Sequence, residues 1–276
     1  MPQGRRGAGR AVKYVWPVIM TLLTYLPIVM VVIYSFNESK LYSVWGGFSF
    51  KWYEALFNDD DMFAALVNSL VLGAVSSVLA AVIATSAALA YDRAKLPFKW
   101  AAEKISILPI IIPEIILGMV LLAFFSLLGI PAGMITLVIA HTSFCIPYIY
   151  TEVRARLQDM DMSPSEAARD LGASGIRAFM TVTLPMIAPA IAAGMFMSFA
   201  MSFDDVIISV FVTGVSVNTL PIIVYTSMKT GVTPEVNALC TLMLAVTLLL
   251  YGAALIIKHA AAVRTGSGRT QRKEPS

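Results

Sequence analysis

The sequence predicts an all-α integral membrane protein with six transmembrane helices. Composition is the first reason. Apolar residues (Ala, Val, Ile, Leu, Met, Phe, Trp, Tyr and Cys) make up 58% of the 276 residues, and charged residues make up only 13%. A soluble domain carries roughly a quarter of charged residues, because its surface must be covered by them. The second reason is that the apolar residues gather into stretches long enough to cross a bilayer, which takes about 20 residues.

Six such stretches follow one another along the chain. The predicted spans are residues 14–36, 63–90, 101–128, 132–151, 183–212 and 236–257. The first is too long for a signal-peptide core, and no small-residue cleavage site follows it, so we expect it to be retained. Prolines interrupt four spans, which is typical either of bent helices around a pathway or of ordinary packing kinks. These prolines are Pro17, Pro27, Pro109, Pro113, Pro147 and Pro189.

The positive charges orient the spans. If the spans alternate, 17 of the 20 Lys and Arg residues fall on one side, and only Lys40, Lys51 and Lys229 fall on the other. The positive-inside rule makes the richer side cytoplasmic. We therefore expect both termini in the cytoplasm, as basic tails at residues 1–13 and 258–276 that flank a membrane domain at 14–257.

Isolated reactive residues exclude several functions. Cys145 and Cys240 lie in apolar runs, where reduced cysteines behave as small hydrophobic side chains. His141 and His259 have no partner at ligand spacing, so neither a metal site nor another cofactor is expected. The net charge of +3 is explained by topology and gives no reason to expect nucleic-acid binding. The chain has no Gly-Lys-Ser/Thr phosphate loop, so it is not expected to hydrolyse nucleotides or to be an enzyme.

The cytoplasmic segment 152–182 has a helical pattern of its own. Ser163-Pro164-Ser165-Glu166 is a typical helix start, in which Ser163 caps and Glu166 closes a capping box. Gly172 is suited to end that helix. A second amphipathic piece then runs to Leu184-Pro185. This pattern is typical either of a surface helix pair or of an element that docks on a partner.

The same segment carries a family motif. Glu166-Ala167-Ala168, Gly172 and Val182-Thr183-Leu184-Pro185 together resemble the EAA loop of binding-protein-dependent ABC importer permeases, which usually have Ile where Val182 stands. The resemblance implies the type I ABC importer permease fold and a coupling loop at 152–185 that contacts a separate ABC ATPase dimer. The residues implied in that contact are Glu166, Ala167, Ala168, Gly172, Leu184 and Pro185.

Acidic residues lie where a membrane makes them costly. Glu114 follows the third-span proline, and Asp204-Asp205 lie toward the outer end of the fifth span, with no Lys or Arg in the interior of a span to neutralise them. Such residues are by default functional candidates. With Glu235 in an outer segment, they predict a pathway for a cation. The alternatives are that one Asp caps a broken helix, and that Glu114 is a protonated structural carboxyl or a helix start.

A narrower resemblance covers residues 25–257. It rests on five motifs, Tyr34-Ser35-Phe36-Asn37, Lys51-Trp52-Tyr53, Pro113-Glu114-Ile115, Ser202-Phe203-Asp204-Asp205 and Pro234-Glu235-Val236-Asn237-Ala238. They are similar to the second permease of spermidine/putrescine importers, although that family often has Asp where Glu114 stands. The resemblance implies polyamine import across a bacterial inner membrane. It also implies three partners besides membrane lipid: a non-identical permease, an ATPase dimer and a periplasmic polyamine-binding protein, which would dock near Trp45, Trp52 and Tyr53 unless these are interfacial anchors.

Three other functions remain open at this stage. The same fold could carry another cargo, such as ferric ion, phosphate or a sugar, although an anion would favour basic residues in the spans. A membrane enzyme could use the Asp pair to hold Mg²⁺ on a prenyl diphosphate, but its only candidate second motif is Asp59–Asp61 in an outer loop. A proton-coupled secondary transporter would not need the docking loop.

Overall fold

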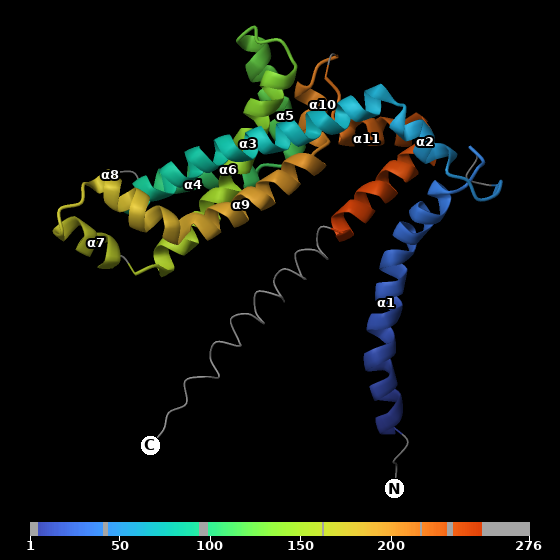
Figure 1. The fold of residues 1–276 in the computed structure, drawn as a ribbon, viewed down its shortest axis with the longest axis horizontal. Helices are drawn as coiled ribbons and strands as arrows, with labels where there is room; N and C mark the ends of the chain where they lie inside the picture. The colour runs from blue at the N-terminus through green and yellow to red at the C-terminus, as the bar shows by residue number, and fades with distance from the viewer. Residues whose placement is uncertain are drawn as a thin grey trace, which may run out of the picture. The chain divides into compact units, whose positions relative to one another are not determined.

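The computed structural model describes residues 5–40, 44–93, 99–161, 163–215, 217–230 and 234–249 (Figure 1). Within these ranges all regular elements are helices, apart from one isolated bridge between Asn37 and Phe48, which confirms the predicted class. The labelled helices are α1 (Arg5–Ser35), α2 (Lys51–Phe57), α3 (Asp60–Arg93), α4 (Lys99–Ile111), α5 (Glu114–Leu127), α6 (Met134–Asp159), α7 (Ser163–Asp170), α8 (Gly175–Ala178), the π-helical turn η1 (Phe179–Thr183), α9 (Leu184–Asp204), α10 (Ile207–Val212) and α11 (Leu220–Thr230).

The chain forms two compact units. The first contains residues 1–59 and 227–276, and the second contains residues 60–226. Four helical segments of the described part are long and apolar enough to cross a membrane, and a bent pair, Glu103–Ile111 with Glu114–Leu127, gives a fifth. The sixth predicted span overlaps the apolar helix Pro234–Leu249, while residues 250–276 lie outside the described residues. The cytoplasmic placement of both termini remains a prediction.

Two predicted spans are broken in the structure. The third turns by 110° between α4 and α5, at Ile112 and Pro113. The fifth was expected to continue to residue 212, and this was wrong: α9 ends at Asp204, and Asp205 adopts an extended conformation (φ −69°, ψ 123°) before the separate short helix α10 begins. Hydropathy alone misses this end, because the apolar run continues from Val206 onward.

Helices α3, α6 and α9 pack side by side as the core of the second unit (Figure 1). The second half of the buried face of α3 consists mostly of small residues: Ala80, Ala84 and Ala88 are fully buried. Val82, by contrast, is 64% exposed. Small side chains face the core and a larger apolar side chain faces outward, which is the reverse of a helix in a soluble protein. This arrangement fits a membrane, where lipid is as apolar as Leu and small residues let helices approach closely. At Gly194 on α9 an added Cβ would lie 2.8 Å from the backbone of α6.

The loop after α1 is organised around Asn37 in the first unit. The carbonyl oxygen of Asn37 accepts a hydrogen bond of 2.6 Å from the indole Nε1 of Trp52, which is buried. The hydroxyl of Tyr53 lies 2.7 Å from the Ser35 hydroxyl. Trp52 and Tyr53 therefore hold the loop together. Among the three aromatic residues singled out in the sequence, Trp45 is 52% exposed and packs edge-on against Tyr34, so it is the one accessible for docking or anchoring.

Candidate functional site

The predicted acidic residues occupy different environments. Asp204 is the last residue of α9 and Glu114 is the first residue of α5. Both are exposed, and neither forms a hydrogen bond or an ion pair within the part of the chain that the structure describes. Glu235 belongs to the first unit and is half-buried near the start of the helix Pro234–Leu249.

Asp205 has a structural role at the break between α9 and α10. Its Oδ1 accepts the N–H of Ile208 at 3.2 Å, and its Oδ2 accepts both the N–H and the hydroxyl of Ser209, at 2.9 and 2.8 Å. These are the contacts of a helix cap, which satisfies N–H groups that have no partner within the first turn. The expectation that one of the two Asp residues caps a broken helix therefore holds for Asp205.

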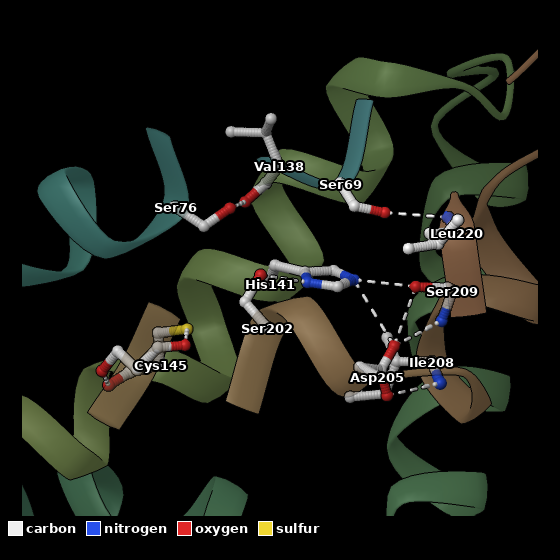
Figure 2. Close-up of polar contacts among 11 residues, drawn as sticks. Ser69, Ser76, Val138, His141, Cys145, Ser202, Asp205, Ile208, Ser209 and Leu220 are labelled. Carbon is white, nitrogen blue, oxygen red and sulfur yellow. Dashed lines mark hydrogen bonds and ion pairs between the residues drawn. The ribbon is translucent and has the colours of Figure 1, made fainter. Parts of the chain in front are cut away.

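His141 on α6 completes this polar cluster, and Figure 2 shows its imidazole facing the residues at the break. Nδ1 lies 2.7 Å from the Ser202 hydroxyl, and Nε2 lies 3.0 Å from the Ser209 hydroxyl and 3.4 Å from Oδ2 of Asp205. His141 is completely buried. The carboxylate and the ring are thus joined within one buried network.

The sequence pointed to the Asp pair but not to His141 or Ser209. His141 had been set aside as isolated, because its partners are 61 and 68 residues away in the chain. One available signal was that a polar side chain in an apolar span needs a partner, since no water reaches it there. The other was the spacing of Ser209, four residues after Asp205 on a helix turn.

Helix α10 is also fixed at its far end. The Thr136 hydroxyl on α6 donates a hydrogen bond of 2.8 Å to the carbonyl oxygen of Val212. On the α5 side, an added Cβ at Gly118 would come within 2.5 Å of the Phe211 ring, so the absence of a side chain at Gly118 leaves room for that ring. Both α5 and α6 therefore contact the short helix α10, which follows the break.

The loop that the sequence predicts to be cytoplasmic folds into α7, α8 and η1 at one end of the core bundle (Figure 1). The N–H and hydroxyl of Ser163 donate to the Asp161 carboxylate at 2.9 and 2.8 Å. These two bonds, the backbone bond foremost, hold the pKa of the Asp161 carboxyl below its usual range. The predicted capping box was wrong: Ser163 is held by Asp161, and no bond to Glu166 is formed within the described residues.

Gly172 ends α7 as predicted. Its φ is +90°, and the N–H of Ala173 donates to the carbonyl oxygen of Ala168 at 3.0 Å, while the N–H of Gly172 donates to that of Arg169 at 2.9 Å. This pair of bonds is the Schellman motif, in which the glycine adopts a left-handed conformation without steric cost. The turn leaves Leu171 91% exposed.

The predicted coupling residues do not all lie on one surface. A groove of about 540 Å³ is lined by Glu166, Arg169, Asp170, Ala173 and Gly175. Ala167 is exposed beside it and Ala168 is half-buried. Leu184 and Pro185 form the first turn of α9, where Leu184 packs against the core of the second unit.

Comparison with known proteins gives the family. Residues 80–262 match the family described as "Binding-protein-dependent transport system inner membrane component". The chain is 41% identical over 244 residues to the putrescine transport system permease protein PotI of Escherichia coli, covering 84% of this chain and 87% of PotI. It is 39% identical over 226 residues to the spermidine/putrescine transport system permease protein PotC of Haemophilus influenzae, covering 82% of this chain and 88% of PotC.

Solved structures agree on the fold. A chain of a bacterial ABC transporter that imports the polysaccharide alginate aligns with a TM-score of 0.69 at 16% identity, over 92% of this chain and 98% of that one. A chain of the MetNI methionine ABC transporter aligns with a TM-score of 0.57 at 20% identity, over 73% and 98%. The family consists of membrane transport components, which decides against the diphosphate enzyme considered above. The chain belongs to the family of inner membrane components of binding-protein-dependent transport systems, and the resemblance seen in its EAA loop is confirmed.

Proposed function

We propose that this chain is the permease subunit of an ABC importer that moves putrescine, spermidine or both into the cytoplasm. The identity of 38–41% to permeases named for these cargoes, over more than four fifths of the chain, supports the cargo class. Its partners would be a second, non-identical permease, an ATPase dimer and a periplasmic polyamine-binding protein. The system would reside in a bacterial inner membrane.

The observation that carries the proposal is that the Asp204 carboxylate is exposed and, in the part of the chain that the structure describes, is not neutralised by a basic side chain. It has no partner within the described residues, and α5, α9 and α10 contain no Lys or Arg. A carboxylate that no protein cation neutralises attracts a cationic cargo, and a low-dielectric surrounding strengthens that attraction. A polyamine has amines at both ends, which suits successive acidic residues.

The other acidic residues then have graded roles. Glu114, also exposed and without a partner, would be a second direct contact with cargo. Asp205 would add charge to the pathway while capping α10, and Glu235 would attract cargo from an outer segment. Several weak contacts suit transport, because each one must also release the cargo.

The cytoplasmic loop would transmit the movement of the ATPase. Exposed Leu171 and Ile176, 91% and 78% exposed, offer apolar contact beside the charged groove that contains Glu166. Ala167 and Ala168 would permit close approach, and Gly172 would set the turn. Leu184 and Pro185 would pass the motion to α9, because they form its first turn.

Uptake of labelled putrescine into proteoliposomes containing the whole transporter tests the pathway. We expect Asp204→Asn to lower the uptake rate about tenfold, because one charge-assisted contact is lost, and Glu114→Gln to lower it less. Asp61→Asn is the matched control, since Asp61 is also an exposed acid, at the start of α3. Uptake by Asp204→Asn at the wild-type rate would remove Asp204 from the pathway. Competition by ferric ion but not by diamines would assign another cargo.

Coupling is tested separately. Gly172→Val places a β-branched residue at φ +90°, where open space surrounds the position, so its effect comes from the backbone alone. We expect this variant and Glu166→Ala to reduce ATP-driven uptake while the binding protein keeps its affinity for polyamine. Asp161→Asn, at the other end of α7, serves as the comparison. Full uptake in both Gly172→Val and Glu166→Ala would exclude the coupling role.

A further inference from the structure

His141 connects the two sides of the break from a third helix. Ser202 lies on α9 and Ser209 on α10, and the ring on α6 contacts the hydroxyl of each, at 2.7 and 3.0 Å (Figure 2). His141, Ser202 and Ser209 are all buried, at 0, 3 and 0% exposure. In a low dielectric, leaving any one of these groups without its partner is costly. The ring therefore helps to hold the geometry of the break, together with the cap from Asp205.

The direction of these hydrogen bonds follows from the donors available. Ser209 has one hydroxyl hydrogen, and it is donated to Oδ2 of Asp205 at 2.8 Å. Toward His141, Ser209 can therefore only accept, so the ring hydrogen is on Nε2. Nδ1 then accepts the hydrogen of Ser202. A neutral ring in this tautomer satisfies the whole chain of bonds from Ser202 through His141 and Ser209 to Asp205.

This chain of bonds ends beside the exposed acid. Asp204 lies between Ser202, which His141 holds, and Asp205, whose carboxylate fixes the start of α10. The backbone on both sides of Asp204 is thus held, while its own carboxylate is free of partners within the described residues. We infer that His141 is a positioning residue of the transport pathway: it fixes the break through Ser202 and Ser209 and so directs the Asp204 carboxylate toward a cationic cargo. This inference rests on the proposed function.

The first test is a double-mutant cycle in proteoliposomes, read as putrescine taken up per ATP hydrolysed. We expect His141→Leu and Asp204→Asn each to lower this ratio, by about tenfold. Because His141 acts through Asp204, the double variant should be no worse than Asp204→Asn alone. Losses that multiply in the double variant would overturn the inference. A wild-type ratio in Asp204→Asn would remove Asp204 from the pathway and overturn the inference, whereas no uptake of putrescine by the wild-type transporter would overturn the proposed function.

Two conservative variants keep the test valid if His141→Leu does not assemble. The amide of Gln reaches the position of Nε2 and can still donate to Ser209, whereas the shorter Asn reaches only the position of Nδ1. We expect His141→Gln to retain most of the transport and His141→Asn to lose it. Thr142→Val is the control, because the Thr142 hydroxyl is buried next to His141 in the sequence and has no hydrogen-bond partner within the described residues. Equal transport by the Gln and Asn variants would overturn the inference.

A readout that does not depend on transport follows the position of residue 204 directly. In an Asp204→Cys background, a cationic thiol reagent should label the cysteine at a rate that changes severalfold when His141→Asn is added. A cysteine in place of Met197, exposed on the same helix, should be labelled at an unchanged rate. Equal labelling of residue 204 with and without His141→Asn would show that His141 does not position it, and would overturn the inference.

Discussion

Two predicted spans are broken, and an acidic residue lies at each break, but different interactions hold the two breaks. Between α4 and α5 the break lies at Pro113, which precedes α5 without any side-chain cap, and Glu114 is exposed beside it. Between α9 and α10 there is no proline, and Asp205, Ser209 and His141 hold the chain by hydrogen bonds. The first break is thus encoded locally by a missing N–H donor, and the second by a tertiary polar network.

The largest effect is expected from removing the cap of the second break. Asp205→Ala leaves the N–H groups of Ile208 and Ser209 and the Ser209 hydroxyl without their acceptor. We expect a loss of about 2 kcal/mol or more in the free energy of unfolding, because a lost cap and buried unpaired donors both contribute. Thermal unfolding of the purified complex measures it.

The matched variant at the first break is Glu114→Ala, which also removes an acidic side chain at a break. It should unfold within about 0.5 kcal/mol of wild type, as surface substitutions usually do. Equal destabilisation by Asp205→Ala and Glu114→Ala would remove the distinction between the two breaks.

This difference also explains what the sequence could reveal. Pro109 and Pro113 predicted that the third span would be interrupted, since a proline is a local signal. The end of α9 at Asp204 was missed because Val206 to Val212 continue the apolar run. The cap from Asp205 and the contacts with α5 and α6 decide that this run forms a separate helix. The EAA loop was found by its spacing, yet the bond from Ser163 to Asp161 depends on a turn that no motif specified.

A similar limit applies to the candidate site. The Asp pair was found because charge is rare in a span, but its division into an exposed Asp204 and a capping Asp205 follows from the direction of the chain at the break. His141 was passed over because its partners come from two other helices. Residues that act through partners distant in sequence cannot be recognised from spacing alone.

A second, smaller effect tests how the two breaks are joined. Gly118 on α5 faces Phe211 on α10, and Gly118→Ala would place a Cβ within 2.5 Å of that ring. We expect a loss of about 1–3 kcal/mol in the free energy of unfolding, because the packed ring must shift. Adding Phe211→Leu should restore part of it. Gly133→Ala, where an added Cβ meets nothing within 4 Å, is the control. No recovery in the double variant would show that the close contact is not the cause.

A smaller effect on stability than at Gly118 is expected at Pro113. Pro113→Ala gives the break back an N–H donor and frees the unfolded chain, so the free energy of unfolding should fall by only about 0.4–1 kcal/mol. The angle between α4 and α5 should change more clearly than the stability, because no side-chain cap holds this break. Spin labels at Ile105 and Leu127, both exposed, report the distance between α4 and α5. We expect the distance distribution to broaden in Pro113→Ala and to stay narrow in Pro109→Ala, within α4. An unchanged distribution in Pro113→Ala would mean that the packing of α5 on α10, and not the proline, sets the 110° turn, which would make both breaks tertiary in origin.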